Sequence, residues 1–206
     1  MPMGDQYTPG QPRTRPLEVL SLGLPRTGTR SMAAALEILG YQHCAHGFDL
    51  MDNPAYAVRW EQAVDAKYYG RGEAFTRKDW DELLGHCSAT TDFPCAAFWR
   101  ELCAAYPEAK VVLVQRDEDK WYTSFVEGVI DSQLSSSGKF VRDYVEPLLG
   151  SILGRLSLKI TQSWLEAATA DGMRANAKSA YRRHYKDVKA VVAKDRLLEY
   201  HLGTLL

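Results

Sequence analysis

The chain has 206 residues, and its 25 lysines and arginines against 26 aspartates and glutamates give a formal net charge of -1. Proteins that bind nucleic acid through counterion release carry an excess of basic residues, so this balance argues against nucleic-acid binding. Hydrophobic residues make up 46% of the chain. No run reaches the roughly 20 apolar residues that span a bilayer, so we expect no membrane partner.

The first sixteen residues differ in character from the rest of the chain. Residues 1–16 contain four prolines and no apolar segment, which excludes a secretory signal and disfavours a helix. We predict residues 1–16 to be a disordered leader and residues 17–206 to form a single domain, a length that can bury a sizeable core. Without a targeting signal, we expect a cytoplasmic protein.

The cysteines and histidines show no metal-ligand spacing. The chain has four cysteines, Cys44, Cys87, Cys95 and Cys103, and no two of them form a C-x-x-C pair. In a cytoplasmic protein we expect them to stay reduced and to pack in the core. His43 and His46 are three residues apart, but no third ligand stands near them in the sequence. We therefore expect no metal site. The other histidines, His86, His184 and His201, are expected at the surface or as hydrogen-bonded core groups.

Taken in chain order, the domain opens with a mostly apolar run at residues 17–24, which predicts a buried strand. A turn-rich loop follows, and apolar residues then recur at helical spacing until Gly40 can end a helix. Three later strands are predicted from similar runs, at residues 87–91, 110–115 and 196–202. Strands that alternate with helices predict a parallel sheet covered on both faces, which is a three-layer α/β fold.

Two helical insertions interrupt this alternation. The first predicts a helix that begins at Asn53-Pro54 and a short helix behind the capping box Thr76-x-x-Asp79. The second runs from about residue 126 to 194 and fits two or three helices, with breaks near residues 135–138 and 171–172. Ligands of open α/β sheets bind at the carboxyl ends of the strands, so we expect the insertions to form the walls or a lid there.

The stretch between the first strand and the first helix has the G-x-x-x-x-G spacing of a phosphate loop: Gly23-Leu24-Pro25-Arg26-Thr27-Gly28-Thr29-Arg30-Ser31. In such a loop backbone N–H groups and the positive end of the helix converge on an anion. Thr29-Arg30 stands where an NTPase carries its lysine and magnesium ligand, which argues against ATP or GTP hydrolysis. A turn that merely joins strand to helix remains the alternative. The missing G-x-G-x-x-G fingerprint disfavours an NAD-dependent oxidoreductase.

Three motifs in this order resemble those of the P-loop sulfotransferases. They are the loop above, Ala89-Thr90-Thr91-Asp92-Phe93-Pro94, and Val114-Gln115-Arg116-Asp117 followed by Lys120-Trp121-Tyr122-x-Ser124. The resemblance covers about residues 17–202 and points to a branch common in fungi and other eukaryotes. It implies a P-loop-type parallel sheet with a helical lid. It also implies transfer of a sulfuryl group from 3′-phosphoadenosine 5′-phosphosulfate (PAPS), without a metal, to a hydroxyl or amine of a small acceptor.

The resemblance also assigns residues to the two phosphates of the donor. The 5′-phosphate would be held by the loop residues Arg26, Thr27, Gly28, Thr29, Arg30 and Ser31. Arg26 stands where the family carries a lysine, and its guanidinium can clamp phosphate oxygens although its high pKa makes it a poor proton donor. Arg116 and Ser124 match the pair that recognises the 3′-phosphate. The alternative for this pair is a surface arginine and an ordinary helix residue.

The group that takes the proton of the acceptor is left open between two residues. Aligned on Pro94, Asp92 stands where well-studied members carry a catalytic histidine. An aspartate can do this work if burial raises its pKa, or it can orient the acceptor instead, but an aspartate before Phe-Pro can equally cap the next helix. His46, with an ordinary pKa of about 6.5, is the alternative base. Arg26, Asp92 and His46 together form the predicted catalytic set.

Compared with the family, the chain looks short at its carboxyl end. Relatives continue past the last strand into a further helix, and we expect this helix to be missing here. We therefore predict that residues 196–202 are exposed, mobile or covered by a partner, for which a second copy of the chain is the candidate. The short end also keeps open a non-catalytic nucleotide-binding protein as the alternative function.

Overall fold

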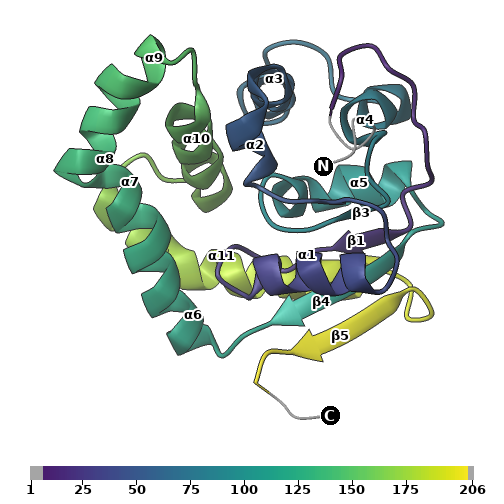
Figure 1. Cartoon of the computed structure of the whole chain (residues 1–206). Coiled ribbons are helices and arrows are strands. Elements are labelled where there is room, and N and C mark those ends of the chain that lie inside the picture. Colours follow the sequence, from purple (N-terminus) through teal and green to yellow (C-terminus); the bar gives the residue numbers. More distant parts are fainter. Residues whose placement is uncertain (1–6, 204–206) are drawn as a thin grey trace.

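The computed structural model describes residues 7–203, which fold around one sheet of five parallel strands (Figure 1). The strands are β1 (Val19–Ser21), β2 (Cys44–Ala45), β3 (Ala89–Thr90), β4 (Lys110–Gln115) and β5 (Leu197–His201). They lie in the order β2-β3-β1-β4-β5, and every pairing is parallel. The predicted α/β fold with a parallel sheet is confirmed.

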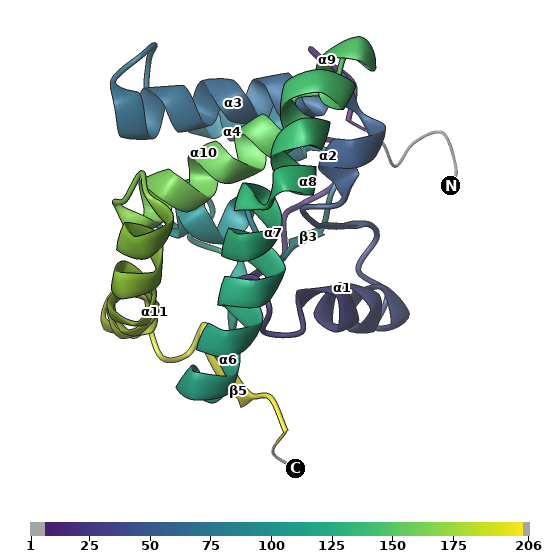
Figure 2. The ribbon, with the colours of Figure 1, turned by 90° about the vertical axis from the view of Figure 1, so that its left-hand side faces the viewer.

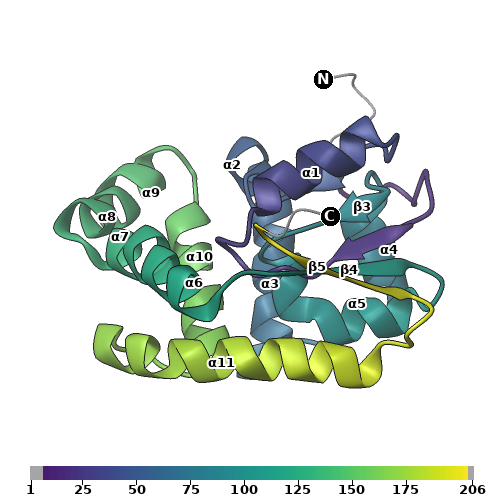
Figure 3. The same cartoon turned by 90° about the horizontal axis from the view of Figure 1, so that it is seen from below.

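Helices cover both faces of the sheet. The flanking elements are α1 (Thr29–Ile38), the 3-10 helix η1 (Cys95–Phe98), α5 (Trp99–Ala105), α6 (Glu118–Phe125) and α11 (Ala170–Val191). Figure 3 shows α1 on one face and α5 with α11 on the other. Successive residues of a strand point to opposite faces. Accordingly Val19 packs with Leu36 beneath α1, whereas Leu20 lies in the large core on the other side.

The two insertions are helical, as predicted. The first contains α2 (Asp49–Asp52), α3 (Pro54–Tyr69) and α4 (Arg77–Leu84). The second contains the π-helices η2 (Val126–Asp131) and η3 (Val141–Val145) together with α7 (Ser132–Leu134), α8 (Ser136–Phe140), α9 (Glu146–Leu148) and α10 (Leu153–Leu165). Figure 2 shows the second insertion running from α6 through α7, α8 and α9 before it returns along α10. The capping box between Thr76 and Asp79 is present.

Several details of the secondary structure differ from the prediction. The first strand covers only Val19–Ser21 of the predicted residues 17–24, and the second insertion divides into more helical segments than the two or three expected. The sequence does not reveal β2, because a strand of two residues is too short to show a period. The expected break near residues 171–172 lies a few residues earlier. The side chain of Thr169 accepts a hydrogen bond from the N–H of Gly172, so Asp171 and Gly172 belong to the first turn of α11.

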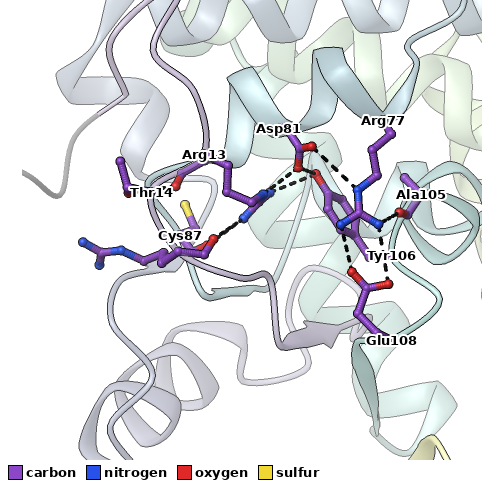
Figure 4. Close-up of polar contacts among 10 residues, drawn as sticks. Arg13, Thr14, Arg77, Asp81, Cys87, Ala105, Tyr106 and Glu108 are labelled. Carbon is purple, nitrogen blue, oxygen red and sulfur yellow. Dashed lines mark hydrogen bonds and ion pairs between the residues drawn. The ribbon is translucent and has the colours of Figure 1, made fainter.

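The described part of the leader, residues 7–16, is packed on the domain rather than disordered, which corrects the prediction. Residues 1–6 lie outside the described residues. Tyr7 is buried, and the Arg13 side chain, 13% exposed, donates to Asp81 (2.6 Å) and to the hydroxyl of Tyr106 (2.9 Å) (Figure 4). Composition does not reveal this attachment, because it depends on a buried tyrosine and an arginine and not on an apolar run.

Replacing Arg13 with alanine is expected to lower the free energy of unfolding by about 2 kcal/mol, since hydrogen bonds to charged groups contribute about 1.5–3 kcal/mol. The loss leaves Asp81 and Tyr106 without this donor. Urea denaturation measures it. Arg71, whose side chain is 74% exposed, is the matched control, and its alanine variant should change the free energy by less than about 0.5 kcal/mol. Equal effects of the two substitutions would contradict the anchoring role.

The last strand forms an edge of the sheet. β5 pairs only with β4 among the described strands, and the side chain of Leu198 is 61% exposed, so the predicted exposure is confirmed. The end of the strand returns to the phosphate loop, because Leu202 lies next to Gly28. A second copy covering this edge stays a prediction. Within residues 7–203, no helix combines the length and apolar character needed to cross a bilayer.

Candidate functional site

A cavity of about 730 Å³ opens at the carboxyl ends of the strands, where the α/β fold predicts a ligand site. The loops after β1, β2, β3 and β4 each contribute to it, and so do both insertions. The predicted site residues that line it are Arg26, Gly28, Thr29, Arg30, His46, Asp92 and Arg116. The insertions add mainly apolar side chains, among them Leu50, Met51, Val129, Leu153 and Ile160. The sheet edge therefore brings together motifs that are up to 90 residues apart.

The phosphate loop is held in shape by its own contacts. Thr27 is fully buried, and both its hydroxyl and its N–H donate to the carbonyl oxygen of Leu24 (2.7 and 3.1 Å). The indole N–H of Trp121 donates to the carbonyl of Pro25 (2.9 Å). A side chain at Gly23 would approach the Thr27 hydroxyl to 2.7 Å. Thr27 thus shapes the loop and is not among the residues that line the cavity, and its contact with the donor stays a prediction.

The start of α1 offers free donors to an anion. Its N-cap is Gly28 in the left-handed region (φ 83°), no side chain of the described chain caps it, and its first turn holds no acidic residue. The first N–H groups of a helix have no partner within the helix, so these amides are available to a ligand. Thr29 and Arg30 line the cavity, whereas Ser31 does not. Helix dipole and arginine charge both favour an anion at this point.

The residues assigned to the two phosphates lie against each other. The Arg26 side chain donates to the Ser124 hydroxyl (3.0 Å), and Arg116 donates to the carbonyl oxygen of Arg26 (2.8 Å). Arg26 itself has φ 72°, a conformation that costs a non-glycine residue energy and is often kept at functional sites. A side chain on Gly128 would come within 3.1 Å of the Arg26 guanidinium. The first turn of the lid therefore closes over this arginine.

A second, more open hollow of about 480 Å³ adjoins the cavity on the other side of Arg116. Its lining comes from α6 and the residues around it: Arg116, Asp119, Lys120, Thr123, Ser124 and Glu127. Asp119 is paired with Lys178 (2.5 Å), so its charge is compensated. Arg116 is common to both hollows, which places the predicted pair of Arg116 and Ser124 beside the phosphate loop rather than on an isolated surface. This position disfavours the alternative of an unrelated surface arginine.

The two candidate bases are neighbours. Nε2 of His46 lies 3.5 Å from Oδ2 of Asp92 and 3.2 Å from the hydroxyl of Thr29. Both side chains are nearly enclosed, with 9% of His46 and 16% of Asp92 exposed. They come from the loops after β2 and β3, two adjacent strands. A side chain at Gly47 would come within 2.7 Å of the carbonyl oxygen of Phe93, so this glycine permits the contact between the loops.

The hydrogen bonds of His46 indicate where its proton lies. The N–H of Phe48 donates to Nδ1 of His46 (3.2 Å), so in the neutral ring Nδ1 is the acceptor and Nε2 carries the hydrogen. Nε2 then donates to the Thr29 hydroxyl and has no lone pair for the proton of an acceptor. In contrast, Oδ1 of Asp92 is buried and has no hydrogen-bond partner within residues 7–203. The free acceptor of the pair is therefore the carboxylate.

Burial raises the pKa of Asp92, although the neighbouring His46 and Arg26 counteract part of this effect. A raised pKa makes the carboxylate a stronger base than an exposed aspartate. The left-handed backbone at this residue (φ 68°) turns it away from the following helix. That helix, η1, begins after Pro94 without a side-chain cap. The cap interpretation of Asp92 is thus wrong, and its side chain belongs to the cavity.

Comparison with known proteins assigns the fold to a family. A family model described as a sulfotransferase domain matches residues 18–204. The chain belongs to the sulfotransferase family. It is also similar to a protein of Aspergillus versicolor named "Ava biosynthesis cluster protein M", with 35% identity over 192 residues that cover 90% of this chain and 71% of that protein. The resemblance seen in the three sequence motifs is confirmed at the level of the family.

Sulfotransferases generally use PAPS as the sulfuryl donor. Several residues of this sulfotransferase site carry no signal in the sequence. Phe48, Gln133, Ser157 and Thr161 line the cavity from the loop after β2 and from the second insertion. No spacing rule connects these positions to the loop, because the lid helices reach the sheet edge only through tertiary packing. None of the tryptophans in the described part of the chain lines the cavity. Trp60, Trp80 and Trp121 lie in the core.

Proposed function

We propose that the protein transfers a sulfuryl group from PAPS to the hydroxyl of a small, largely apolar acceptor. One observation carries the proposal: a buried carboxylate with a free oxygen, Oδ1 of Asp92, lines the same cavity as the uncapped start of α1. A proton acceptor and an anion site within one enclosure are what such a transfer requires.

The residues present fit a donor that carries two phosphates. The amides at the start of α1, with Arg26 and Arg30 beside them, would hold the 5′-phosphate. Arg116 and Ser124 in the adjoining hollow would hold the 3′-phosphate. Arginine binds phosphate oxygens through paired N–H donors, which suits both positions. When bound, PAPS supplies a sulfuryl group attached to a phosphate that can leave with the bonding electrons.

The side chains of the site then account for every charge and proton of the transfer. The hydroxyl oxygen of the acceptor forms the new bond to sulfur while the bond from sulfur to the 5′-phosphate oxygen breaks. Asp92 takes the hydroxyl proton on Oδ1 and is neutral afterwards. Arg26 and the α1 amides compensate the charge that develops on the phosphate. Arg26 stays protonated throughout because of its high pKa, so it acts by charge and not as an acid.

His46 positions the base in this scheme. Its Nε2 lies 3.5 Å from Oδ2 of Asp92, which leaves Oδ1 for the acceptor, and the N–H of Phe48 keeps the ring hydrogen on Nε2. Thr29 supports the same arrangement from the first turn of α1. The predicted catalytic set of Arg26, Asp92 and His46 is therefore retained, with charge compensation, proton acceptance and positioning as the three roles.

The walls of the cavity indicate the acceptor class. Away from the arginines the lining is mostly apolar, with Phe48, Leu50 and Met51 on one side and Val129, Leu153 and Ile160 on the other. The remaining polar groups there are uncharged, such as Gln133 and Thr161. An uncharged apolar molecule with one hydroxyl fits this lining. The name of the Aspergillus versicolor relative links that protein to a biosynthesis cluster, which supports a small-molecule acceptor here.

Titration with adenosine 3′,5′-bisphosphate, the product form of the donor, tests the proposal. We expect the melting temperature to rise, since a ligand present at 100 times its Kd stabilises a protein by about 2.7 kcal/mol. NAD at the same concentration is the control and should give no shift. A shift with NAD alone would revive the oxidoreductase alternative. Binding of the bisphosphate without sulfate transfer to any acceptor in a screen would favour the non-catalytic alternative.

A further inference from the structure

Behind the loop that carries His46, the structure groups three side chains that the proposed transfer does not use. His43, His86 and Cys87 each offer one ligand atom, and these atoms all lie within 4.8 Å of one another. His43 directly precedes β2, whereas His86 and Cys87 lie between α4 and β3. The N–H of Ser88 donates to the carbonyl of His43 (3.3 Å), which holds the two segments together. In the sequence, His43 has only His46 as a nearby candidate ligand. The fold brings two other candidates, His86 and Cys87, beside His43 from a different loop.

The cluster is buried and one of its nitrogen atoms has no partner. Cys87 is fully buried and His86 is 8% exposed. Nδ1 of His86 makes no hydrogen bond to any described part of the chain. A buried polar atom left without a partner costs about 1–3 kcal/mol. His86 therefore differs from the hydrogen-bonded core histidine expected from the sequence, and its nitrogen is available to a ligand.

The residue types suit metal binding. Histidine binds a metal ion as the neutral imidazole, and cysteine binds it as the thiolate. Binding would release the thiol proton of Cys87 to solvent as the sulfur–metal bond forms.

A carboxylate orients one of the three residues. Nε2 of His43 lies 3.3 Å from Oδ2 of Asp49. Histidines that bind metals usually donate their second ring N–H to a carboxylate, which fixes the tautomer. Here that bond leaves Nδ1 of His43 as the nitrogen with a lone pair.

We propose that His43, His86 and Cys87 bind a divalent transition-metal ion of the zinc type. Two imidazoles and one thiolate are the ligands that zinc prefers. The charges also balance, because the two positive charges of the ion would be matched by the Cys87 thiolate and the Asp49 carboxylate. A buried site without net charge avoids the desolvation cost of an unpaired ion.

The proposed ion would support the transferase site from behind. Oδ2 of Asp49 also accepts a hydrogen bond from the N–H of His46 (2.9 Å). The ion would fix His43 and thereby Asp49, and Asp49 holds the loop from which His46 reaches Asp92. The role is structural, since none of the three proposed ligands lines the cavity. The inference does not depend on the proposed reaction, and its test needs no sulfuryl donor.

The experiment loads the purified chain with Zn²⁺, removes the excess ion and measures the metal content by mass spectrometry. We expect about one ion per chain, because the three ligands form one site. The Cys87→Ser and His86→Gln variants should lose most of the bound zinc. Cys103→Ser is the matched control, because Cys103 is also a buried free cysteine but lies outside the cluster. Asp49→Asn should weaken zinc binding about 10- to 100-fold, as changes to such supporting carboxylates do.

Cobalt provides a readout that needs no variant. Co²⁺ bound to the unchanged protein should give a thiolate-to-cobalt charge-transfer band in the near ultraviolet, and added Zn²⁺ should remove it. A chain that retains no zinc and shows no such band would overturn the proposal and leave an aromatic cluster, in which Tyr7 and Tyr56 pack near His86. Equal zinc content in the Cys87→Ser and Cys103→Ser variants would overturn it as well.

Discussion

Replacing Asp92 with asparagine is expected to lower kcat by about 10²- to 10⁴-fold, the usual contribution of a general base. Asparagine has nearly the same shape as aspartate, but its amide cannot take the proton of the acceptor at neutral pH. The affinity for adenosine 3′,5′-bisphosphate should stay the same, since Asp92 faces the acceptor side of the cavity in the proposed arrangement. Steady-state kinetics with a sulfated product, together with bisphosphate titration, measures both quantities.

The same variant should be at least as stable as the unchanged protein. Burial raises the pKa of Asp92 in the folded chain above its unfolded value. An acid shifted in this direction destabilises the fold at pH values above both pKa values, and this cost disappears as the pH falls below them. Asparagine removes the buried charge, so we expect an equal or higher melting temperature at pH 7. Asp171→Asn, at a side chain that is 97% exposed, is the control for both rate and stability.

The pH profile separates the two candidate bases. If Asp92 is the base, kcat falls as the pH drops through its raised pKa, and the asparagine variant loses this limb of the profile. His46→Gln should reduce the rate less than Asp92→Asn, because His46 acts through the carboxylate. A rate that survives Asp92→Asn but not His46→Gln would contradict the assignment and make His46 the base.

The second large effect is expected at Arg116, where alanine should remove about half or more of the thermal stabilisation by adenosine 3′,5′-bisphosphate. Two contributions are lost. Arg116 lines the hollow assigned to the 3′-phosphate, and it donates to the carbonyl of Arg26 and so supports the phosphate loop. Hydrogen bonds to charged groups contribute about 1.5–3 kcal/mol, which corresponds to a Kd that rises about 10- to 100-fold. Calorimetry or thermal-shift titration measures the change.

Adenosine 5′-monophosphate distinguishes these two contributions. The unchanged protein should bind the bisphosphate more tightly than the monophosphate. Ser124→Ala should reduce this preference while it keeps the bond from Arg116 to the carbonyl of Arg26, although it removes the hydroxyl that accepts from the Arg26 side chain. Arg182 pairs with Glu118 and is 67% exposed, so Arg182→Ala is the matched control for the loss of one arginine. A preference for the bisphosphate that persists in both Arg116→Ala and Ser124→Ala would place the 3′-phosphate elsewhere.

Local patterns were sufficient where one segment contains the whole signal. The strand at residues 110–115 was predicted with its observed bounds, because a buried parallel strand reads as a continuous apolar run. The capping box of α4 was likewise predicted, since its two partners are three residues apart. The predictions failed where the signal is short or depends on distant partners. β2 has two residues, and the leader is attached by contacts from Arg13 to Asp81 and Tyr106.

The parallel α/β fold and the family could be predicted from the sequence alone, because they follow from spacings within single segments. The sequence also indicated a candidate anion-binding loop and named Asp92 and His46 as candidate bases. The roles proposed for these two residues rest on the tertiary structure, since the proton position of His46 depends on the N–H of Phe48 and the free oxygen of Asp92 depends on its burial. The grouping of His43 with His86 and Cys87 arises in the same way. Distances between loops are set by how the strands pair, and no local pattern records them.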